Sequence, residues 1–469
     1  MRSSASRTSD VARVAHVALL GLVSLIIIGC DSPAKQEPLP VKAVEVAAPP
    51  AEPALPKETC PSWAKLDVAK LPELPASPYA VNFEQVWRIV LEKHFDPTLG
   101  CQDWPARRLE FGAKLADAND QAAAYAVMNE LLGTLKQSHF KAVPPAETGS
   151  LGPARVPVRV RMIDGKAVVV DAAVGGVVSG VPRGAIVTAV EGKPIADILA
   201  RAEGASMGAH EVAAALHGAD GAMRQVTFLD PGKGDAEVTR AVKCVMPTGE
   251  LVTIGNLHDL PTTVSHRIIK GTGVGYLAFN YWMLPLVKRV EAAMTELRAQ
   301  GMKGLVLDLR GNPGGVGAMS IPVARMLLTQ PGSLGKLQFR EFAQEFNVAG
   351  NADAFTGPVV VLVDEDTAST SEIFAAGLRD LGRVQIYGSR ASAGAALPSL
   401  IETLDGGGML QYVVGDYHSS KGAVAEGDGV KPDVVVPETR EGFVAGRDAV
   451  LDAAVKALST GGAAAKVQP

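Results

Sequence analysis

The sequence is poor in the features that mark nucleic-acid-binding and metal-binding proteins. Its 469 residues carry 45 Lys and Arg against 50 Asp and Glu, a net charge of −5. The basic residues form no cluster that would follow a phosphate backbone. Four cysteines occur, and they lack the paired Cys or His spacing of a zinc site. We therefore expect no nucleic-acid partner and no metal.

An apolar stretch near the N-terminus, residues 17–28, is too short to span a bilayer. Three arginines precede it, which is typical of a secretory leader. It ends in Ile-Ile-Gly-Cys at residues 27–30, which resembles a bacterial lipobox. The resemblance implies that residues 1–29 are a signal peptide and that Cys30 becomes the lipidated N-terminus. The alternative is an uncleaved hydrophobic anchor with an incidental cysteine.

Either way, the bulk of the chain lies outside the cytoplasm, in a compartment where disulfides persist. Cys60, Cys101 and Cys244 remain after Cys30, an odd number that leaves a Cys60–Cys101 bridge as one option. Asp31 follows Cys30 and resembles a lipoprotein sorting signal for the inner membrane. We expect a periplasmic protein with a lipid anchor, and the sequence does not fix its oligomeric state.

Composition and periodicity divide the chain. Prolines are frequent up to Pro78, a composition that stays extended. Helical spacing of apolar residues then follows, with Asn82 as an expected cap. The predicted segments are a signal peptide (1–29), a Pro-rich tether (30–78), a helical unit (79–150), a small β-rich domain (151–245), a protease core (250–460) and a flexible tail (461–469).

The β-rich segment alternates apolar and polar residues from Val156 to Met162, and Asp164-Gly165 then predicts a tight hairpin turn. Residues 181–195 resemble the central strands of a PDZ domain, whose edge can accept an extended peptide as an added strand. The alternative is another small β-rich insert. From Gly273 onward, apolar strands alternate with helical stretches, which predicts an α/β class sheet covered by helices.

A hydroxyl group lies at one strand-to-helix turn of this region. The strand at residues 359–363 runs into Thr-Ala-Ser-Thr-Ser-Glu-Ile at residues 367–373, with Ser369 at the turn. Such a turn can present a nucleophile next to free N–H groups. On spacing alone, Ser369 and Glu372 also fit a helix-capping box.

Two blocks resemble the C-terminal processing peptidases, the superfamily that includes the tricorn protease core and the interphotoreceptor retinoid-binding protein repeats. One is the Ser369 segment with Gly388 after the next strand, and the other is residues 304–315, which match an Asp-x-Arg-x-Asn-x-Gly-Gly pattern. The resemblance implies a ββα-type, crotonase-like mixed sheet-and-helix core. It also implies that Ser369 is the nucleophile.

The second block also indicates how substrate would be held. The resemblance implies substrate contacts at Gly314 and Gly315 and oxyanion-hole N–H groups from Gly315 and Thr370. The alternative is a plain turn with Asp308 and Arg310 as a structural ion pair.

The expected base differs from that of one branch of the family. In the tail-specific branch the base is a Lys shortly after the strand that ends near Gly388, but residues 388–398 contain no Lys. This departure points to the tricorn-like branch, in which a Ser-His pair ahead of the β-rich insert would supply the base. Ser138 and His139 match this pair. A distant Lys such as Lys421 is the alternative.

A third block, residues 426–433, resembles the tricorn-like Glu-x-x-Gly-Val-x-Pro-Asp pattern. It implies a Ser-His-Ser-Glu tetrad in which Glu426 holds Ser138 and Ser138 orients His139. Asp428 is a substitute for Glu426. The other histidines are rivals of His139, and they are His94, His210, His217, His258, His266 and His418.

We therefore predict a serine peptidase that cleaves protein or peptide substrates in the cell envelope through an acyl-enzyme. The resemblance implies no metal or organic cofactor. The alternative is a non-catalytic lipoprotein that binds peptides or hydrophobic ligands on the same scaffold.

Overall fold

The computed structural model describes residues 60–145, 154–174, 177–200, 211–254, 257–422 and 425–460. All of these belong to one compact unit that extends from Glu58 to the C-terminus. The predicted signal peptide, the lipidation site Cys30 and the tail 461–469 lie outside the described residues. No helix in the described part of the chain is long and apolar enough to cross a membrane.

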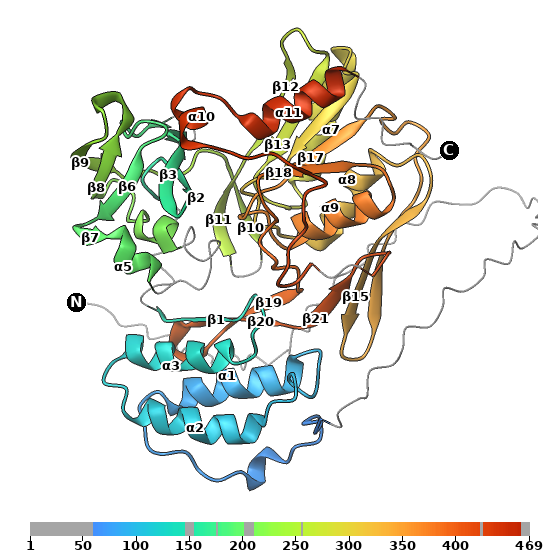
Figure 1. Cartoon of the computed structure of the whole chain (residues 1–469). Coiled ribbons are helices and arrows are strands. Elements are labelled where there is room, and N and C mark those ends of the chain that lie inside the picture. Colours follow the sequence, from blue (N-terminus) through green and yellow to red (C-terminus); the bar gives the residue numbers. More distant parts are fainter. Residues whose placement is uncertain are drawn as a thin grey trace, which may run out of the picture. The chain divides into compact units, whose positions relative to one another are not determined.

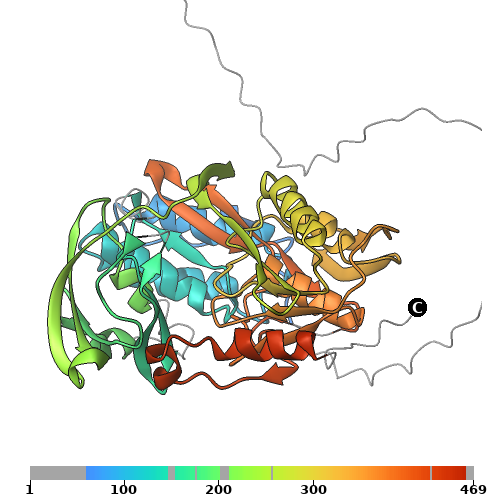
Figure 2. The ribbon, with the colours of Figure 1, turned by 90° about the horizontal axis from the view of Figure 1, so that it is seen from above.

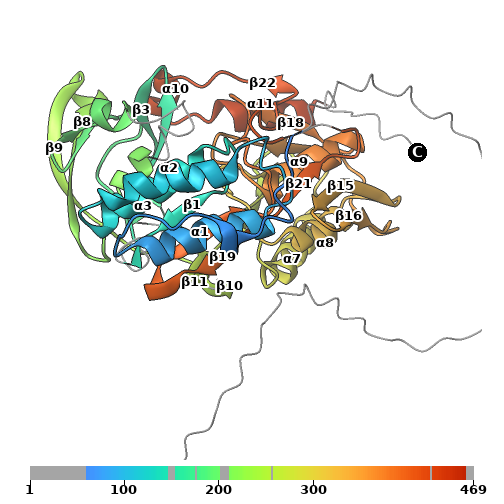
Figure 3. The same ribbon diagram turned by 90° about the horizontal axis from the view of Figure 1, so that it is seen from below.

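The helical unit consists of α1 (Ala80–Lys93), α2 (Trp104–Ala116) and α3 (Gln121–Gly133). These helices lie together at the bottom of Figure 1 and face the viewer in Figure 3. Their apolar faces bury Phe83, Trp87 and Met128 in a common core. The expected cap at Asn82 is wrong, because α1 begins earlier, after Tyr79, and the Asn82 amide instead donates to the Asp405 carbonyl at 2.6 Å.

The last part of the predicted tether is packed rather than free. Trp63, Leu66 and Leu74 contact the helical core, and the Trp63 indole donates to the Gln102 carbonyl at 2.8 Å. Cys60 and Cys101 form a disulfide. The tether therefore remains a prediction only for residues before Cys60.

The β-rich segment folds into a sheet with the order β2-β3-β6-β8-β9. Its strands are β2 (Arg159–Ile163), β3 (Lys166–Asp171), β6 (Ile186–Val190), β8 (Met223–Asp230) and β9 (Ala236–Lys243), with the short β7 (Lys193–Pro194) beside β6 and the helix α5 (Ile195–Leu199) after it. The predicted hairpin is confirmed, since Asp164 and Gly165 both have positive φ between β2 and β3, as a type I′ turn requires. We call this sheet and its helix the five-stranded unit.

The core contains a six-stranded sheet with the order β12-β13-β14-β17-β18-β22. Its strands are β12 (Val264–Ile269), β13 (Val274–Phe279), β14 (Gly304–Asp308), β17 (Val359–Leu362), β18 (Gln385–Gly388) and β22 (Val434–Val435). All neighbours are parallel except β12 and β13. The mixed α/β class predicted from the sequence is confirmed.

Helices cover both faces of this sheet, which explains the continuous apolar runs of its strands. The helices α7 (Leu286–Ala299), α8 (Ser320–Arg325) and α9 (Thr370–Asp380) share a core with one face, and α11 (Ala449–Ser459) packs on the other. Figure 2 shows α7 in yellow and α11 in red on opposite sides of the sheet.

Smaller sheets complete the molecule. A three-stranded sheet joins β1 (Lys141–Val143) to β20 (Met409–Val413) and β19 (Ser399–Thr403). The remaining elements are β4 (Ala173–Val174), β5 (Val177–Val178), β10 (Glu250–Ile254), β11 (Leu257–Thr262), β15 (Gly332–Phe339), β16 (Ala343–Val348), β21 (Gly415–His418) and α10 (Arg440–Val444). The β1–β20 pairing connects the helical unit to the core, 266 positions apart at Val143 and Met409.

Candidate active site

Ser369 lies at the turn between β17 and α9, in a backbone conformation that few residues adopt. Its φ is 55° and its ψ is −120°, outside the ordinary allowed regions for a residue with a side chain. The turn before it is tied down, because the Thr367 hydroxyl donates to the Leu309 carbonyl at 2.9 Å. Ser369 is half-buried. A strained, fixed turn of this kind presents a side chain in one direction.

A glycine loop presses against this turn. A Cβ atom at Gly314 would lie 2.6 Å from Cβ of Ser369, and one at Gly315 would lie 2.4 Å from the Trp282 carbonyl oxygen. Both glycines have positive φ, 100° and 142°. Close approach and backbone conformation therefore both require glycine here. The loop could not come so near Ser369 with any other residue.

Two N–H groups beside Ser369 are free to donate. Among the described residues, neither the N–H of Gly315 nor the N–H of Thr370 has a hydrogen-bond acceptor. The Thr370 hydroxyl holds the two segments together by donating to the Gly315 carbonyl at 2.9 Å. Paired free N–H groups next to a hydroxyl are what stabilisation of an oxyanion needs.

Trp282 holds the glycine loop in place, and no sequence motif pointed to this residue. Its N–H donates to the Gly314 carbonyl at 2.9 Å, and its carbonyl accepts from the Val316 N–H at 2.6 Å. Its indole donates to the Ser371 hydroxyl at 2.8 Å, which in turn donates to the Asn312 carbonyl at 3.0 Å. One buried side chain thus joins the loop to the helix that follows Ser369.

Ser138, His139 and Glu426 form a hydrogen-bonded chain. The Ser138 hydroxyl lies 2.7 Å from Nδ1 of His139 and 2.9 Å from Oε2 of Glu426. The Ser138 N–H also donates to Oε1 of Glu426 at 2.7 Å. Since Glu426 is 288 positions from Ser138, the fold brings them together.

The surroundings of His139 keep its ring neutral. Burial lowers the pKa of His139 to about 4. When the Ser138 hydroxyl donates to an ionised Glu426, it can only accept from Nδ1, which places the ring hydrogen on Nδ1. Nε2 then carries a lone pair. A neutral imidazole in this tautomer is able to accept a proton.

Ser369 and the Glu426–Ser138–His139 chain are both held by the same segment, at the neighbouring residues Ala395 and Ala396. The Ser369 N–H donates to the Ala395 carbonyl at 2.8 Å. Glu426 accepts from the N–H of the next residue, Ala396, at 3.1 Å. The Ser369 hydroxyl and the His139 ring make no hydrogen bond to each other. Bonds of this kind are often long without substrate and tighten when it binds.

The chain matches two family profiles over the regions that build this site. Residues 273–436 match peptidase family S41, and residues 75–133 match the tricorn protease C1 domain. The chain contains a peptidase family S41 domain and a tricorn protease C1 domain. It is therefore a serine peptidase, a hydrolase of peptide bonds, and the non-catalytic alternative is disfavoured.

Relatives of this serine peptidase match over most of its length. The carboxyl-terminal-processing protease of Picosynechococcus sp. is 26% identical over 370 residues, which cover 76% of this chain and 83% of the relative. The protease of the same name from Synechocystis sp. is 27% identical over 377 residues, covering 76% and 80%.

Solved structures share the fold. The photosystem II D1 C-terminal processing protease has a TM-score of 0.55 at 24% identity, with 82% of this chain and 98% of that chain covered. Mature CPAF has a TM-score of 0.61 at 15% identity, with 82% and 99% covered. These likenesses confirm the S41 fold.

Ser369 is a helix cap, as the structural alternative expected. Ser369 is the N-cap of α9, and its N–H donates to Oε2 of Glu372 at 3.0 Å. Glu372 is fully buried and accepts from the N–H groups of Gly394 and Ala395 at 2.9 Å each. Its fourth donor is the Ser392 hydroxyl at 2.5 Å.

Four donors around Glu372 fit an ionised carboxylate, because the three N–H groups can only donate. Burial acts against them and raises the pKa of Glu372 to about 7. The carboxylate thereby holds the segment that accepts the Ser369 N–H. This role could have been read only partly from the capping-box spacing.

The rivals of His139 that the structure describes have other surroundings. His94 bonds to Gln137, His266 pairs with Glu296 and His418 pairs with Asp416. His210 lies outside the described residues, as does the side chain of His258. Asp428 is exposed and pairs with Lys431, so it does not replace Glu426. Lys421 is exposed, and its N–H bonds to Asp380.

Asp308 and Arg310 form the structural ion pair considered as an alternative. Arg310 lies 2.7 Å from Asp308 and 2.8 Å from Asp448 in the turn before α11. The pair therefore ties the end of β14 to the C-terminal segment. Within the described residues, no group of His, Cys, Asp and Glu could hold a metal ion.

Proposed function

We propose that Ser369 is the nucleophile of this S41 peptidase and that His139 is its general base and acid. The observation that carries the proposal is the hydrogen-bonded chain from Glu426 through Ser138 to His139. Glu426 binds the N–H of Ala396, and the neighbouring residue Ala395 accepts from the N–H of Ser369. Ser138 and Glu426 act as positioning residues that set the tautomer of the imidazole.

The reaction proceeds through an acyl-enzyme. Nε2 of His139 accepts the proton of the Ser369 hydroxyl while Oγ attacks the peptide carbonyl. The imidazolium then gives this proton to the leaving amine. A water molecule, deprotonated by the same nitrogen, attacks the ester carbonyl, and the imidazolium returns the proton to Oγ of Ser369 as the ester bond breaks and the acid leaves. The N–H groups of Gly315 and Thr370 donate to the oxyanion, and Gly314 and Gly315 bind the substrate backbone.

A fluorophosphonate probe on the purified full-length protein tests the nucleophile. We expect labelling of the wild type and loss of labelling in Ser369→Ala. Ser420→Ala is a suitable control, because Ser420 is exposed and its hydroxyl makes only a 3.5 Å contact with Asp380. Ser371 is unsuitable because its hydroxyl holds Trp282. Labelling that survives Ser369→Ala would instead support the non-catalytic binder.

We also propose that the chain processes proteins near their carboxyl end, with residues 151–245 as a PDZ-like domain that holds the substrate. The names of the relatives support this function. The five-stranded unit supports it as well, because an edge strand can accept an added peptide strand. Intact-mass analysis of a digested protein substrate should give a shortened C-terminus and an unchanged N-terminus. Scattered internal cuts would exclude this preference.

For location, we propose a periplasmic peptidase anchored by lipid on Cys30, with Asp31 favouring the inner membrane. The Cys60–Cys101 disulfide supports an oxidising compartment. Cys30→Ala should move the protein from the membrane fraction to the soluble fraction. Retention of Cys30→Ala in the membrane would instead favour the uncleaved anchor.

A further inference from the structure

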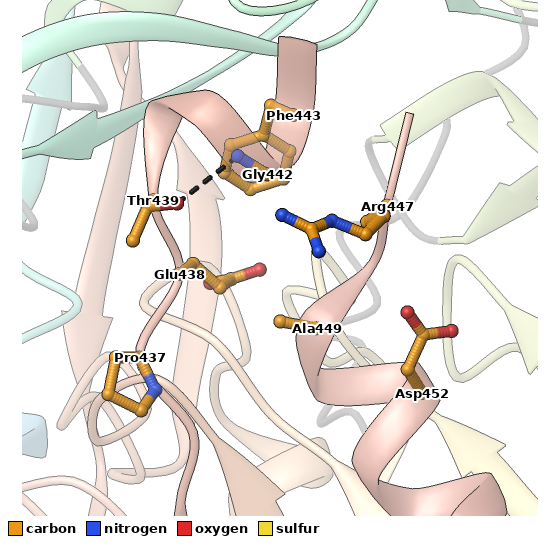
Figure 4. A pocket seen from close by; sticks show the side chains of 8 residues that line it. All are labelled: Pro437, Glu438, Thr439, Gly442, Phe443, Arg447, Ala449 and Asp452. Atoms are coloured by element: carbon orange, nitrogen blue, oxygen red, sulfur yellow. Dashed lines mark hydrogen bonds between the residues drawn. The ribbon is translucent and has the colours of Figure 1, made fainter. Parts of the chain in front are cut away.

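Two cavities near α10 favour no ligand of either charge. The smaller, of about 270 Å³, has the carboxylates of Glu438 and Asp452 and the guanidinium of Arg447 in its wall (Figure 4). The larger, of about 580 Å³, is lined by five arginines and four carboxylates. A buried histidine close to the proposed base supports a more specific inference.

This histidine is His94, which the proposed mechanism does not use. It follows the last turn of α1 and is 1% exposed. Arg340, between β15 and β16, donates to the carbonyls of His94 and Leu91 at 2.8 and 3.0 Å. A guanidinium at this place satisfies carbonyls that the end of a helix leaves free. The core therefore holds the end of α1 from which the His94 ring extends.

Hydrogen bonds fix the orientation of the His94 ring. Nε2 lies 2.8 Å from Oε1 of Gln137, and Nδ1 lies 3.1 Å from the Asp96 nitrogen and 3.0 Å from the Asp96 carbonyl oxygen. Since an amide oxygen only accepts, Nε2 carries the hydrogen and donates it to Gln137. Nδ1 of the neutral ring then accepts from the Asp96 N–H. The Asp96 carboxylate in turn accepts from the N–H groups of Thr98 and Gly100 at 2.8 and 2.9 Å, which fixes this turn.

The His94 ring contacts the chain on both sides of the proposed catalytic pair. Gln137 directly precedes Ser138 and His139, and Phe140 directly follows them. The Phe140 ring lies beside the His94 ring, with centroids 5.9 Å apart and planes 24° from parallel. One buried side chain thus holds both residues that flank the pair.

The backbone of this segment needs such support. Lys136 has a φ of 54° and His139 has a φ of 61°, values that residues with a side chain seldom adopt. Conformations of this kind persist where the surrounding contacts fix them. Glu426 holds Ser138 from the core. His94 supplies contacts from the helical unit.

We propose that His94 is a positioning residue, which acts through Gln137 to hold Ser138 and His139 in the orientation that proton transfer needs. The inference rests on the proposed function, in which His139 is the base. His94 itself exchanges no proton in the reaction. A base displaced by about 1 Å loses much of its rate, so the loss of this hold should slow the chemical step and leave binding nearly unchanged.

The kinetics of fluorophosphonate labelling of the full-length protein test this role without a known substrate. Oγ of Ser369 displaces fluoride from phosphorus while His139 takes the proton of the hydroxyl. The maximal labelling rate, kinact, therefore reports on the base, and the half-saturating probe concentration, KI, reports on binding.

His94→Phe keeps a ring beside Phe140 and removes the donor, and Gln137→Met keeps the chain length and removes the acceptor. We expect kinact to fall by about tenfold in each variant, with KI within about twofold of the wild type. The double variant should also lose about tenfold rather than a hundredfold, because the two side chains act as one unit. Gln137→Glu retains an accepting oxygen and should stay within about threefold of the wild type.

Trp104→Phe is the matched control for lost stability. Trp104 is fully buried in the same helical unit, and its indole donates to the Trp87 carbonyl at 3.2 Å. We expect this variant to lower Tm and to leave kinact unchanged. If His94→Phe does not fold, Gln137→Met carries the comparison, since Gln137 is only half-buried.

A wild-type kinact in Gln137→Met would overturn the proposal. So would additive losses in the double variant, or an equal fall of kinact in Trp104→Phe at the same loss of Tm. Failure of the proposed function gives different results: labelling that survives Ser369→Ala, or a kinact that is unchanged in His139→Ala.

Discussion

At Ser138 one hydroxyl hydrogen serves two neighbours, and its direction decides the state of the imidazole. The hydroxyl lies 2.9 Å from Glu426 and 2.7 Å from Nδ1 of His139. If Glu426 accepts this hydrogen, Nδ1 must donate and Nε2 is free for a proton. If Ser138 donates to Nδ1 instead, Nε2 carries the hydrogen and cannot act as a base. We therefore expect the charge of Glu426 to set the tautomer of His139 through the two hydrogen bonds of Ser138.

Glu426→Gln should reverse the direction of the hydrogen bonds that link residue 426, Ser138 and His139. The Gln amide donates to Ser138, which then donates to Nδ1 and produces the inactive tautomer. We expect kcat to fall by about 10²- to 10⁴-fold with little change in KM. Asp428→Asn, an exposed carboxylate two residues away, is the matched control. A Glu426→Gln enzyme as active as Asp428→Asn would contradict the assignment.

The acid limb of the pH dependence of kcat/KM should lie at lower pH than an ordinary histidine base would give. In the proposed mechanism the base is neutral His139, and burial lowers the pKa of His139 to about 4. Because a lowered pKa keeps the base free to lower pH, kcat/KM should persist well below pH 6.5, the ordinary imidazole range. Burial raises the pKa of Glu426, so its protonation should contribute to the loss at acid pH. A pH–rate profile whose acid limb is centred at or above 6.5 would show that another group, or an exposed His139, is titrating.

At the scale of elements, Trp282 joins three segments that the chemistry needs in register. It follows β13, bonds to the Gly314–Val316 loop, and reaches α9 through Ser371. Its ring packs edge-on against Phe279, with centroids 4.8 Å apart. Sequence patterns identified the glycines and the serine, but they do not reveal a brace whose contacts come from three separate parts of the chain.

Trp282→Phe should keep the packing and remove the indole donor. We expect kcat to fall by about tenfold with KM nearly constant, because the free N–H groups near Ser369 lose their exact placement. Trp63→Phe is the matched control, since Trp63 likewise donates its indole N–H, in this case to the Gln102 carbonyl in the helical unit. Equal kcat in both variants would show that the loop does not need this brace.

At the scale of the whole molecule, the site depends on one pairing between distant parts of the chain. His139 lies two residues before β1, and β1 pairs with β20 of the core. Glu426 and the 395–396 segment lie on the core side of this pairing. If His139 is the base, the helical unit that carries it is part of the catalytic assembly, and we expect the stability of this unit to affect activity.

The disulfide should stabilise that unit. Cys60 and Cys101 close a segment with a sequence separation of 41. Replacing both by Ser should lower the free energy of unfolding of the unit by about 2–4 kcal/mol. Urea unfolding followed by tryptophan fluorescence measures this, because Trp63, Trp87 and Trp104 lie there. Reductant should destabilise the wild type and leave the double variant unchanged. Identical midpoints for both proteins would refute a stabilising role.

Prediction from sequence succeeded where a local pattern carried the information. The β2–β3 hairpin, the α/β alternation, the Ser369 turn and the glycine loop were all expected. The start of α1 was misplaced at Asn82, because its side chain bonds to Asp405, a residue 323 positions away. The catalytic roles of Ser369, His139, Ser138 and Glu426 stay predictions that activity measurements must test.

The amino-acid pattern was sufficient to indicate an S41 domain and to propose the groups at the site, since turn glycines, strand periodicity and short motifs act over a few residues. The fold alone decided that Ser138 meets Glu426, that Trp282 braces the glycine loop and that five arginines line one cavity. These contacts join residues that no local rule relates. They arise because helices and strands pack to bury apolar surface, and that packing sets which distant side chains become neighbours.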